Sequence, residues 1–345
     1  MPELPERAAL RADLLAFVAA PDPGAFDALA DRVVAYQAAA LPVYGRLVAA
    51  RGGATTWREA PLVPTDLFRD LDLCSKPGAE ATFRTSGTTV GARGTRRVPD
   101  LSLYDAAMSA PFVAHVLGGD ASRRPWLSLV PPVDVAPDSS LSHMISALAE
   151  RYASDVTWAF DQATGVDVAA SEAFARDADG PVVVLTTAFA LAHLLDVMEV
   201  PSPLPAGSRV MVTGGFKGKA REVSEKAQLA DVERLLGVPV DAVVPEYGMT
   251  ELSSQAYGRP LRANPTLRLR VVDPQSQMDL PKGEVGLVAC FDLLNLDNVS
   301  ALLTGDLGQL DEEGRLTLLG RAPDAVVRGC SLTAEELHAR TRGGA

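Results

Sequence analysis

Hydrophobic positions in the middle of the chain fall into short apolar runs that alternate with longer helical patterns. The runs at residues 182–185, 209–212 and 241–244 have the length and composition of buried strands. Between them, residues 188–198 form an apolar stretch and residues 222–236 an amphipathic one, each long enough for a helix. This alternation predicts right-handed β-α-β units and a parallel sheet. Ligands of such sheets bind beyond the carboxyl ends of the strands.

Outside this region the pattern predicts helices before the sheet and strands after it. Residues 26–36 carry apolar side chains at helical spacing, and a further helix is expected to start at Thr65. From about residue 265 the pattern changes to short apolar segments separated by polar turns, which indicates a β-rich subdomain. A capping box that begins at Thr333 predicts a short terminal helix. The strands expected outside the central region are 126–130, 267–272, 286–291 and 316–319.

The size and charge of the chain narrow the class of protein. A chain of 345 residues exceeds the roughly 250–300 residues at which a single core stops growing, so we expect two or more subdomains. Hydrophobic residues make up 47% of it, which is ample for packed interiors. A net charge of −12 argues against nucleic acid or an anionic membrane surface as the main partner.

Cysteine and histidine are too few and too scattered for a disulfide framework or a metal cluster. The chain has three cysteines and four histidines, without paired spacing. No apolar run approaches the ~20 residues needed to span a bilayer, and the first residues do not resemble a signal peptide. We therefore expect a protein of the reducing cytoplasm, without a membrane partner.

Two separated stretches have the chemistry of a nucleotide site. Residues 85–89 (Thr-Ser-Gly-Thr-Thr) offer hydroxyl and backbone N–H groups to phosphate oxygens. Residues 247–251 (Tyr-Gly-Met-Thr-Glu) offer an aromatic face, a hydroxyl and the carboxylate that Mg²⁺ prefers. A solvated turn and a capped helix N-terminus are the alternatives for the two stretches taken singly. Arg93, Arg96 and Arg97 follow the first stretch and are expected to neutralise a departing pyrophosphate.

The chain resembles the adenylate-forming superfamily of acyl-CoA synthetases, adenylation domains and luciferases. Four segments occur in the superfamily's order: residues 85–89, 247–251 and 304–307 (Thr-Gly-Asp-Leu), and Gly320-Arg321 followed by Asp324. Residues 63–68, 213–219 and 328–332 are similar to the acyl-protein synthetase branch, typified by the bacterial bioluminescence fatty-acid synthetase. One departure lies at residues 90–94 (Val-Gly-Ala-Arg-Gly), where the superfamily usually has Gly-x-Pro-Lys-Gly. Arginine in place of lysine keeps the charge but changes its geometry.

The resemblance implies an α/β fold and a domain organisation. Residues 1–320 are expected to form the large domain of an adenylate-forming enzyme, with parallel-sheet α/β subdomains and a β-rich part at about 265–320. Residues 321–345 are expected to be a short tail in place of the usual mobile C-terminal domain. That domain supplies a lysine to the reacting carboxylate and phosphate in full-length members. Lys217 or Lys219 is a candidate to supply the cation here, and two solvated surface lysines are the alternative.

The resemblance also assigns roles to single residues. Tyr247 is the expected adenine platform, Asp306 accepts hydrogen bonds from the ribose hydroxyls, and Arg321 donates to the same sugar. A turn between strands is the alternative for Asp306. His143 stands where many relatives have a histidine in the wall of the substrate pocket, and a satisfied interior histidine is the alternative. The expected catalytic residues in the two stretches are Thr85, Ser86, Thr88, Thr89 and Glu251, which is also the metal ligand. The expected nucleotide-binding residues are Gly87, Gly214, Gly215, Glu246, Tyr247, Gly248, Met249, Thr250, Asp306 and Arg321.

Cys330 is the candidate acyl acceptor. It follows Arg328 and precedes the helix expected at Thr333, and both a cation and a helix N-terminus lower the pKa of a thiol. In the acyl-protein synthetases a cysteine near the C-terminus carries the fatty acyl group, and Cys330 resembles it by its Arg-Gly-Cys-Ser context. A small buried apolar cysteine is the alternative. Cys74 and Cys290 have no comparable setting.

The resulting functional prediction is an ATP- and Mg²⁺-dependent ligase. It activates a small carboxylic acid as an acyl adenylate and passes the acyl group to a thiol. The acceptor is Cys330, an acyl carrier protein or other acyl-accepting enzyme, or CoA. The alternatives are a free-standing acyl-CoA or carrier-protein ligase, an amide-forming adenylating enzyme, and a non-catalytic nucleotide-binding subunit.

Overall fold

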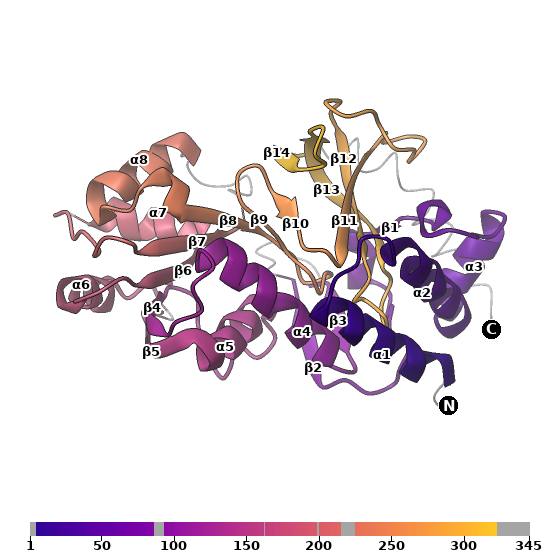
Figure 1. Cartoon of the computed structure of the whole chain (residues 1–345), viewed down its shortest axis with the longest axis horizontal. Helices are drawn as coiled ribbons and strands as arrows, with labels where there is room; N and C mark the ends of the chain where they lie inside the picture. Colours follow the sequence, from indigo (N-terminus) through magenta and orange to yellow (C-terminus); the bar gives the residue numbers. More distant parts are fainter. Residues whose placement is uncertain (1–4, 86–92, 162, 199, 215–224, 323–345) are drawn as a thin grey trace. The chain divides into compact units, whose positions relative to one another are not determined.

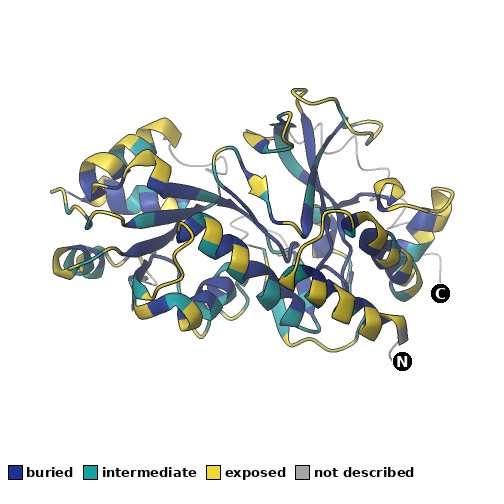
Figure 2. Ribbon diagram, in the orientation of Figure 1, coloured by how far each residue is buried: buried dark blue, intermediate teal, exposed yellow. Residues whose placement is uncertain are grey.

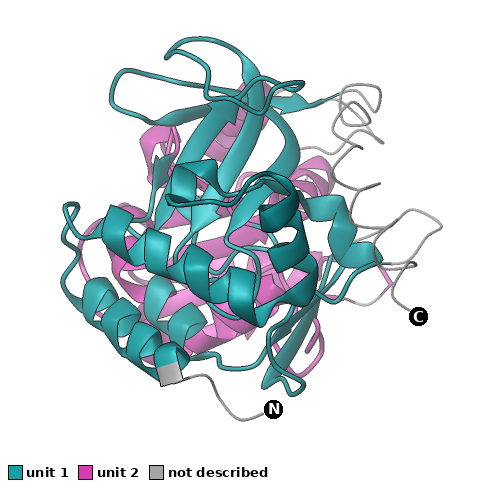
Figure 3. Ribbon diagram, turned by 90° about the vertical axis from the view of Figure 1, so that its right-hand side faces the viewer, with its two compact units in different colours: residues 1–107, 249–256, 262–345 teal, residues 108–248, 257–261 magenta. Residues whose placement is uncertain are grey.

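The computed structural model describes residues 5–85, 93–161, 163–198, 200–214 and 225–322. The chain divides into two compact units (Figure 3). Unit 1 comprises Met1–Ala107, Met249–Ala256 and Arg262–Ala345, and unit 2 comprises Met108–Gly248 and Tyr257–Leu261. The division into a large domain of residues 1–320 and a tail of residues 321–345 stays a prediction.

Unit 2 is built on a mainly parallel sheet (Figure 1). Its strand order is β9-β8-β7-β6-β4-β5, and the ladders that join β5, β4, β6, β7 and β8 are all parallel. The register pairs Thr187 with Thr213 and Thr213 with Glu246, so the carboxyl ends of three strands lie at one edge. The parallel sheet expected from the central pattern is therefore confirmed. The strands are β4 (Arg124–Ser128), β5 (Ala153–Trp158), β6 (Val183–Thr187), β7 (Arg209–Thr213), β8 (Val243–Tyr247) and β9 (Ala256–Tyr257).

Helices α5, α6 and α7 of unit 2 begin at residues with capping side chains, and α6, α7 and α8 bury one face against the sheet. Ser139, Asp167 and Thr187 each accept a hydrogen bond from the backbone N–H three residues later. Alternate strand residues such as Val184 and Val210 share one hydrophobic cluster with α6, α7 and α8. The helices are η3 (Phe112–Val116), α5 (Ser140–Tyr152), α6 (Val168–Asp177), α7 (Ala188–Val197), α8 (Glu225–Leu236) and η4 (Val240–Ala242).

Unit 1 contains a five-stranded sheet and a hairpin. The order β1-β13-β12-β11 has β14 paired with β13, and every ladder except the parallel β1–β13 is antiparallel. Strand β11 has the bounds expected from the sequence, whereas β13 was not predicted. The strands are β1 (Val63–Pro64), β11 (Leu267–Val272), β12 (Gly286–Asp292), β13 (Ala301–Leu310) and β14 (Leu316–Arg321), the hairpin strands β2 (Ala81–Arg84) and β3 (Thr95–Val98), and the short β10 (Arg262–Ala263).

Helices pack on the sheet of unit 1 through an aromatic cluster. The ring of Phe26 lies 5.7 Å from that of Trp57 and 6.3 Å from that of Phe291, with the guanidinium of Arg268 3.7 Å from its centre. Every residue from Gly286 to Thr304 is buried (Figure 2). The helices are α1 (Pro5–Ala19), α2 (Phe26–Ala40), α3 (Pro42–Ala50), η1 (Trp57–Glu59), η2 (Thr65–Arg69) and α4 (Ser102–Pro111), most of which lies in unit 1.

None of the described helices is by itself long and apolar enough to cross a membrane, although α2 and α3 pass that test as a pair bent by 111°.

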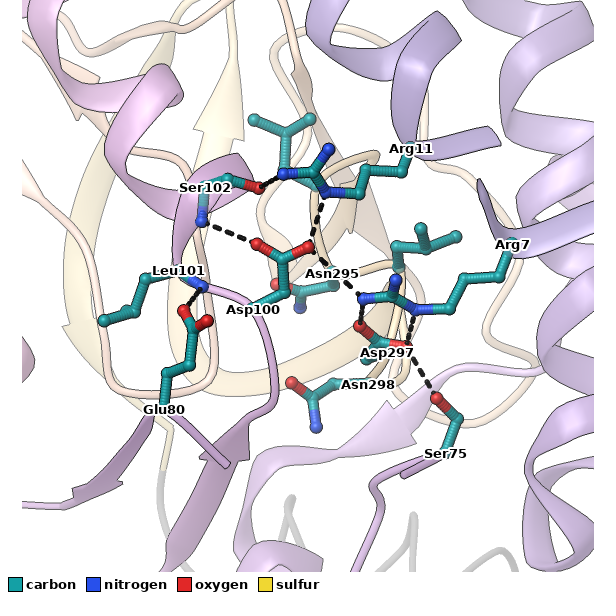
Figure 4. Close-up of polar contacts among 12 residues, drawn as sticks. Arg7, Arg11, Ser75, Glu80, Asp100, Leu101, Ser102, Asn295, Asp297 and Asn298 are labelled. Atoms are coloured by element: carbon teal, nitrogen blue, oxygen red, sulfur yellow. Dashed lines mark hydrogen bonds and ion pairs between the residues drawn. The ribbon is translucent and has the colours of Figure 1, made fainter. Parts of the chain in front are cut away.

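A polar network ties helix α1 to two loops of unit 1 (Figure 4). The Nε of Arg7 donates to Oδ1 of Asp297 at 2.8 Å, and the Ser75 hydroxyl donates to the same oxygen at 2.7 Å. Arg11 donates to Asp100 and to the hydroxyl of Ser102. Burial raises the pKa of Asp100, but the hydrogen bonds from Ser102 and Arg11 lower it further, to about 2. The Asp100 carboxyl is therefore ionised at neutral pH.

Arg7→Met should destabilise the protein by about 3–5 kcal/mol, because it leaves Asp297 buried without its cation. The side chains of this pair are only 5% and 7% exposed. Arg32→Met is the control, because the Arg32–Asp13 pair is exposed and its loss should cost less than about 1 kcal/mol. Urea unfolding followed by circular dichroism measures both values, and equal losses would contradict the assignment.

Glu246 provides a second test. Burial raises its pKa to about 7. A raised carboxyl pKa means that the folded state holds the proton more tightly, so this stabilisation is complete below pH 4.5 and is lost as the pH rises through 7.

Glu246→Gln should therefore gain stability relative to the natural chain between pH 4.5 and 8, by on the order of 2–3 kcal/mol. Urea unfolding across that range measures the gain. Glu312→Gln, on an exposed turn, should show no such trend. A constant difference between Glu246→Gln and the natural chain would rule out the buried neutral carboxyl.

Candidate functional site

The hairpin β2–β3 closes the two ends of the predicted phosphate loop. The N–H of Thr85 donates to the carbonyl of Gly94 at 2.9 Å, and the N–H of Gly94 donates to the Thr85 hydroxyl at 2.9 Å. A Cβ on Gly94 would lie 3.0 Å from the Thr85 methyl group, so a side chain there would crowd this closure. The loop is thus fixed at both ends within unit 1. Ser86, Gly87, Thr88 and Thr89 lie outside the described residues.

The three arginines after this loop do not form the expected pyrophosphate clamp. Arg96 is only 2% exposed and donates all its bonds to protein acceptors, so its predicted contact with pyrophosphate is wrong. Arg97 is paired with Asp72. Arg93 is exposed and donates to the carbonyl of Thr85 at 2.7 Å, at the entrance to the loop.

Arg96 instead joins the loop's hairpin to the second predicted motif. Its Nη1 donates to the carbonyl oxygens of Thr250 at 3.2 Å and Leu252 at 2.7 Å. Its Nη2 donates to the Ser253 hydroxyl and, at 2.7 Å, to Oδ1 of Asn295. Two stretches about 150 residues apart in the sequence therefore meet in unit 1 through one side chain.

A buried polar segment, residues 292–300, holds the same motif from its other side. Asn295 donates through Nδ2 to the carbonyl of Glu251 at 2.8 Å. Asp292 accepts from the N–H groups of Ser253 and Ser254, both at 2.8 Å. This segment was missed in the sequence. Its signal is the placing of Asp and Asn among leucines in the stretch Phe-Asp-Leu-Leu-Asn-Leu-Asp-Asn.

In unit 2 the predicted residues lie at the carboxyl ends of β7 and β8. Gly214 donates its N–H to the carbonyl of Glu246 at 3.4 Å and has a φ of +77°, which suits glycine. Tyr247 is 7% exposed and ends β8. In the described part of the chain, neither the Thr213 hydroxyl nor Oε2 of Glu246 has a hydrogen-bond partner, although both atoms are buried. Gly248 also belongs to unit 2, whereas Met249, Thr250 and Glu251 belong to unit 1.

The predicted ribose pair lies on neighbouring strands of unit 1. The register sets Asp306 of β13 opposite Arg321 of β14, and Oδ1 of the carboxylate lies 3.3 Å from Nε of the guanidinium. The Asp306 side chain is 18% exposed and that of Arg321 is 50% exposed, so both are accessible from one side. Thr304 accepts from the N–H of Asp306 at 3.1 Å and donates to the carbonyl of Val288, which holds the strand in place.

The remaining candidates are distributed differently. His143 is half-buried in helix α5 of unit 2. Gly215, Lys217, Lys219 and Cys330 lie outside the described residues. Burial raises the pKa of the Cys74 and Cys290 thiols, which makes both poor nucleophiles.

The described residues contain no group of three or more His, Cys, Asp or Glu side chains suited to a metal. A cation held by Glu251 would therefore need the phosphates of a ligand to complete its coordination, as is usual for Mg²⁺.

Comparison with known proteins gives a likeness in sequence to one curated protein. No protein-family model matches the chain. The nonribosomal peptide synthetase apvA of Aspergillus terreus is 28% identical over 173 residues, which is 40% of this chain and 19% of that protein.

Solved structures share the backbone fold at low sequence identity. ATP-bound MatB from Rhodopseudomonas palustris matches with a TM-score of 0.52 and 19% identity, over 71% of this chain and 49% of that chain. An open conformation of 2-hydroxyisobutyryl-CoA ligase, in complex with 2-HIB-AMP and CoA, matches with a TM-score of 0.64 and 15% identity. That match covers 84% of this chain and 73% of the ligase.

The chain spans about half the length of MatB and about a fifth of apvA. Its backbone follows that of MatB and of 2-hydroxyisobutyryl-CoA ligase across most of its own length. The chain therefore has the α/β fold of the adenylate-forming enzymes, as the sequence resemblance predicts.

Proposed function

We propose that this chain activates a carboxylic acid with ATP and Mg²⁺ to give an acyl adenylate and pyrophosphate. The observation that carries the proposal is the contact of Arg96, next to the Thr85–Gly94 loop, with the carbonyls of Thr250 and Leu252. The stem of the predicted phosphate loop and the Thr250–Glu251 part of the second stretch thereby belong to one structural unit. The fold is shared with MatB, whose structure holds ATP, and with a ligase whose structure holds 2-HIB-AMP.

In this reaction a carboxylate oxygen attacks the α-phosphorus in line, and the bond to pyrophosphate breaks. The loop of Thr85, Ser86, Thr88 and Thr89 would hold phosphate oxygens through hydroxyl and backbone N–H groups. Glu251 would hold the Mg²⁺ that neutralises the triphosphate. Arg93, exposed at the loop's entrance, is the remaining cation of the three arginines for the departing pyrophosphate. Such catalysis depends on positioning and electrostatics more than on proton transfer.

Further roles are proposed for residues of each unit taken by itself. Tyr247, at the end of β8, is proposed to stack on adenine, and among the described residues no atom lies within 4 Å of a Cβ built on Gly214. Asp306 accepts from the ribose hydroxyls, and Arg321 restrains that carboxylate and donates to the sugar. His143 is proposed for the wall of the acid pocket, and Lys217 or Lys219 for the cation at the reacting carboxylate.

Pyrophosphate exchange with a panel of carboxylic acids tests the first step. At least one acid should support exchange, and Glu251→Gln should lower the rate about 100- to 1,000-fold because a metal ligand is lost. Asp306→Asn should raise KM for ATP about 10-fold through the loss of charged hydrogen bonds to the ribose. Glu284→Gln, an exposed residue of unit 1, is the control and should keep the full rate. Binding of Mg·ATP without exchange for any acid would contradict the proposal.

The acyl group would then pass to a thiol, and Cys330 is the candidate within this chain. Its thiolate would attack the acyl carbonyl, AMP would leave with the bonding electrons, and a thioester would remain. Incubation with ATP and a productive acid should add one hydroxylamine-labile acyl group to the intact protein, as measured by mass spectrometry. Cys330→Ser should abolish the adduct and leave pyrophosphate exchange unchanged. An adduct of equal yield in that variant would exclude Cys330 and favour another acceptor.

A further inference from the structure

One buried side chain, that of Arg96, has a hydrogen-bond acceptor for each of its donors. The guanidinium of Arg96 has five N–H donors. The structure gives it five acceptors in the described residues: Oδ1 of Asn298, the carbonyls of Thr250 and Leu252, the Ser253 hydroxyl and Oδ1 of Asn295. Every donor therefore has an acceptor, at distances of 3.2 Å or less.

We propose that Arg96 is a positioning residue of the acid-activating site, which fixes the backbone of Thr250, Glu251 and Leu252 against the stem of the Thr85–Gly94 loop. The proposal rests on the function proposed above, because it assigns Arg96 to the geometry of the same site. Arg96 touches no substrate in this account, and it acts through the peptide groups that carry the side chains of Thr250 and Glu251.

The first argument is the continuity of the restraint. The carbonyls of three consecutive residues are held, those of Thr250 and Leu252 by Arg96 and that of Glu251 by Asn295. Asp292 then holds the N–H groups of the next two residues, Ser253 and Ser254. Five successive residues thus have a backbone atom fixed by buried polar side chains. The backbone that carries the side chains of Thr250 and Glu251 is therefore fixed, which is the preorganisation that a metal ligand requires.

The second argument is the charge of the Arg96 guanidinium and the place of Arg96 on the hairpin. Arg96 lies on β3 two residues after Gly94, where the loop closes, so a shift of the guanidinium moves the loop's end as well. A buried arginine needs an opposite charge nearby, and Asp292 favours its charged form while burial disfavours it. Arg96 holds residues 250–254 through carbonyl groups, and Asp292 holds them through N–H groups.

The third argument is that no other residue type satisfies this site. A lysine ammonium has three donors against the five acceptors present, and it lacks the planar fork that meets acceptors on several sides. Arg96→Lys therefore keeps the positive charge and most of the volume, but offers donors to at most three of the five acceptors. That substitution therefore tests the hydrogen-bond geometry of the Arg96 side chain independently of its positive charge.

A matched control is available in the same unit. Arg7 is also buried and also contacts the 292–300 segment, through Asp297, and it forms a further ion pair with Asp100. Arg7→Lys and Arg96→Lys should thus cost comparable stability, while only the second disturbs the Thr250–Glu251 turn.

The experiment compares the full-length chain with Arg96→Lys and Arg7→Lys, at a temperature where urea unfolding shows all three folded. Calorimetric binding of ATP with and without Mg²⁺ is the first readout, and kcat and KM in pyrophosphate exchange are the second. Arg96→Lys should lose about 10-fold in the affinity gained from Mg²⁺ and about 100-fold in kcat, as expected for a shift of about 1 Å in a metal ligand. Arg7→Lys should stay within about twofold of the natural chain in both.

Loss of stability in Arg96→Lys without any change in the Mg²⁺-dependent affinity or in kcat would overturn the proposal. If Arg96→Lys does not fold, Asn295→Asp tests the other part of the restraint, because it removes the donor to the Glu251 carbonyl, keeps an acceptor for Arg96 and adds a negative charge. An unchanged Mg²⁺-dependent affinity and kcat in that variant would also count against the proposal. The binding readout keeps the two proposals apart. A natural chain that binds Mg·ATP in an Arg96-dependent way but exchanges pyrophosphate with no acid would refute the acid activation and retain the positioning role. A natural chain that binds no Mg·ATP would refute both.

Discussion

The structure of unit 1 depends on the requirement that buried polar groups be paired. Residues 292–300 run through the interior with every residue buried, so their carbonyl, amide and carboxylate groups cannot use water. Three long polar side chains meet this need. Gln37 contacts the carbonyls of Asn295 and Asn298 and accepts from the N–H of Ser300, Arg7 pairs with Asp297, and Arg96 donates to Asn295 and Asn298. Helices α1 and α2 and the β2–β3 hairpin are therefore all fastened to one segment.

That fastening links fold to function. The segment that anchors these elements also holds the backbone of Thr250–Ser254, so the packing of the core and the geometry of the motif are set by the same hydrogen bonds. A polar interior of this kind costs desolvation and gives little net stability compared with an apolar one. What a polar interior contributes is specificity of geometry. Hydrogen bonds restrict the backbone to one arrangement, whereas apolar contacts tolerate several.

Sequence pattern predicted the parallel sheet of unit 2 because each strand is a short apolar run and each connection has helical length. It missed β13, since that strand passes from buried leucines into Gly305 and Asp306 and shows no steady period. The two motifs were visible as local chemistry. The residues that hold them were not, because the Arg96–Thr250 and Asn295–Glu251 contacts join positions 154 and 44 residues apart, and no local period records such a pairing.

The position of Arg96 shows that the sequence does predict which arginine of the hairpin is buried. In a strand, alternate side chains face opposite sides, so Arg96 and Val98 of β3 share one side and Arg97 has the other. Val98 is 5% exposed, and Phe83, the cross-strand neighbour of Arg96, is fully buried. A strand reading of Thr-Arg-Arg-Val therefore places the first arginine inside and the second outside, where Arg97 meets Asp72. Three basic residues beside a phosphate loop suggest a cluster for an anion, but the period of two divides them. A buried arginine must then find acceptors within the protein, and the carbonyls of the second motif are the acceptors that it found.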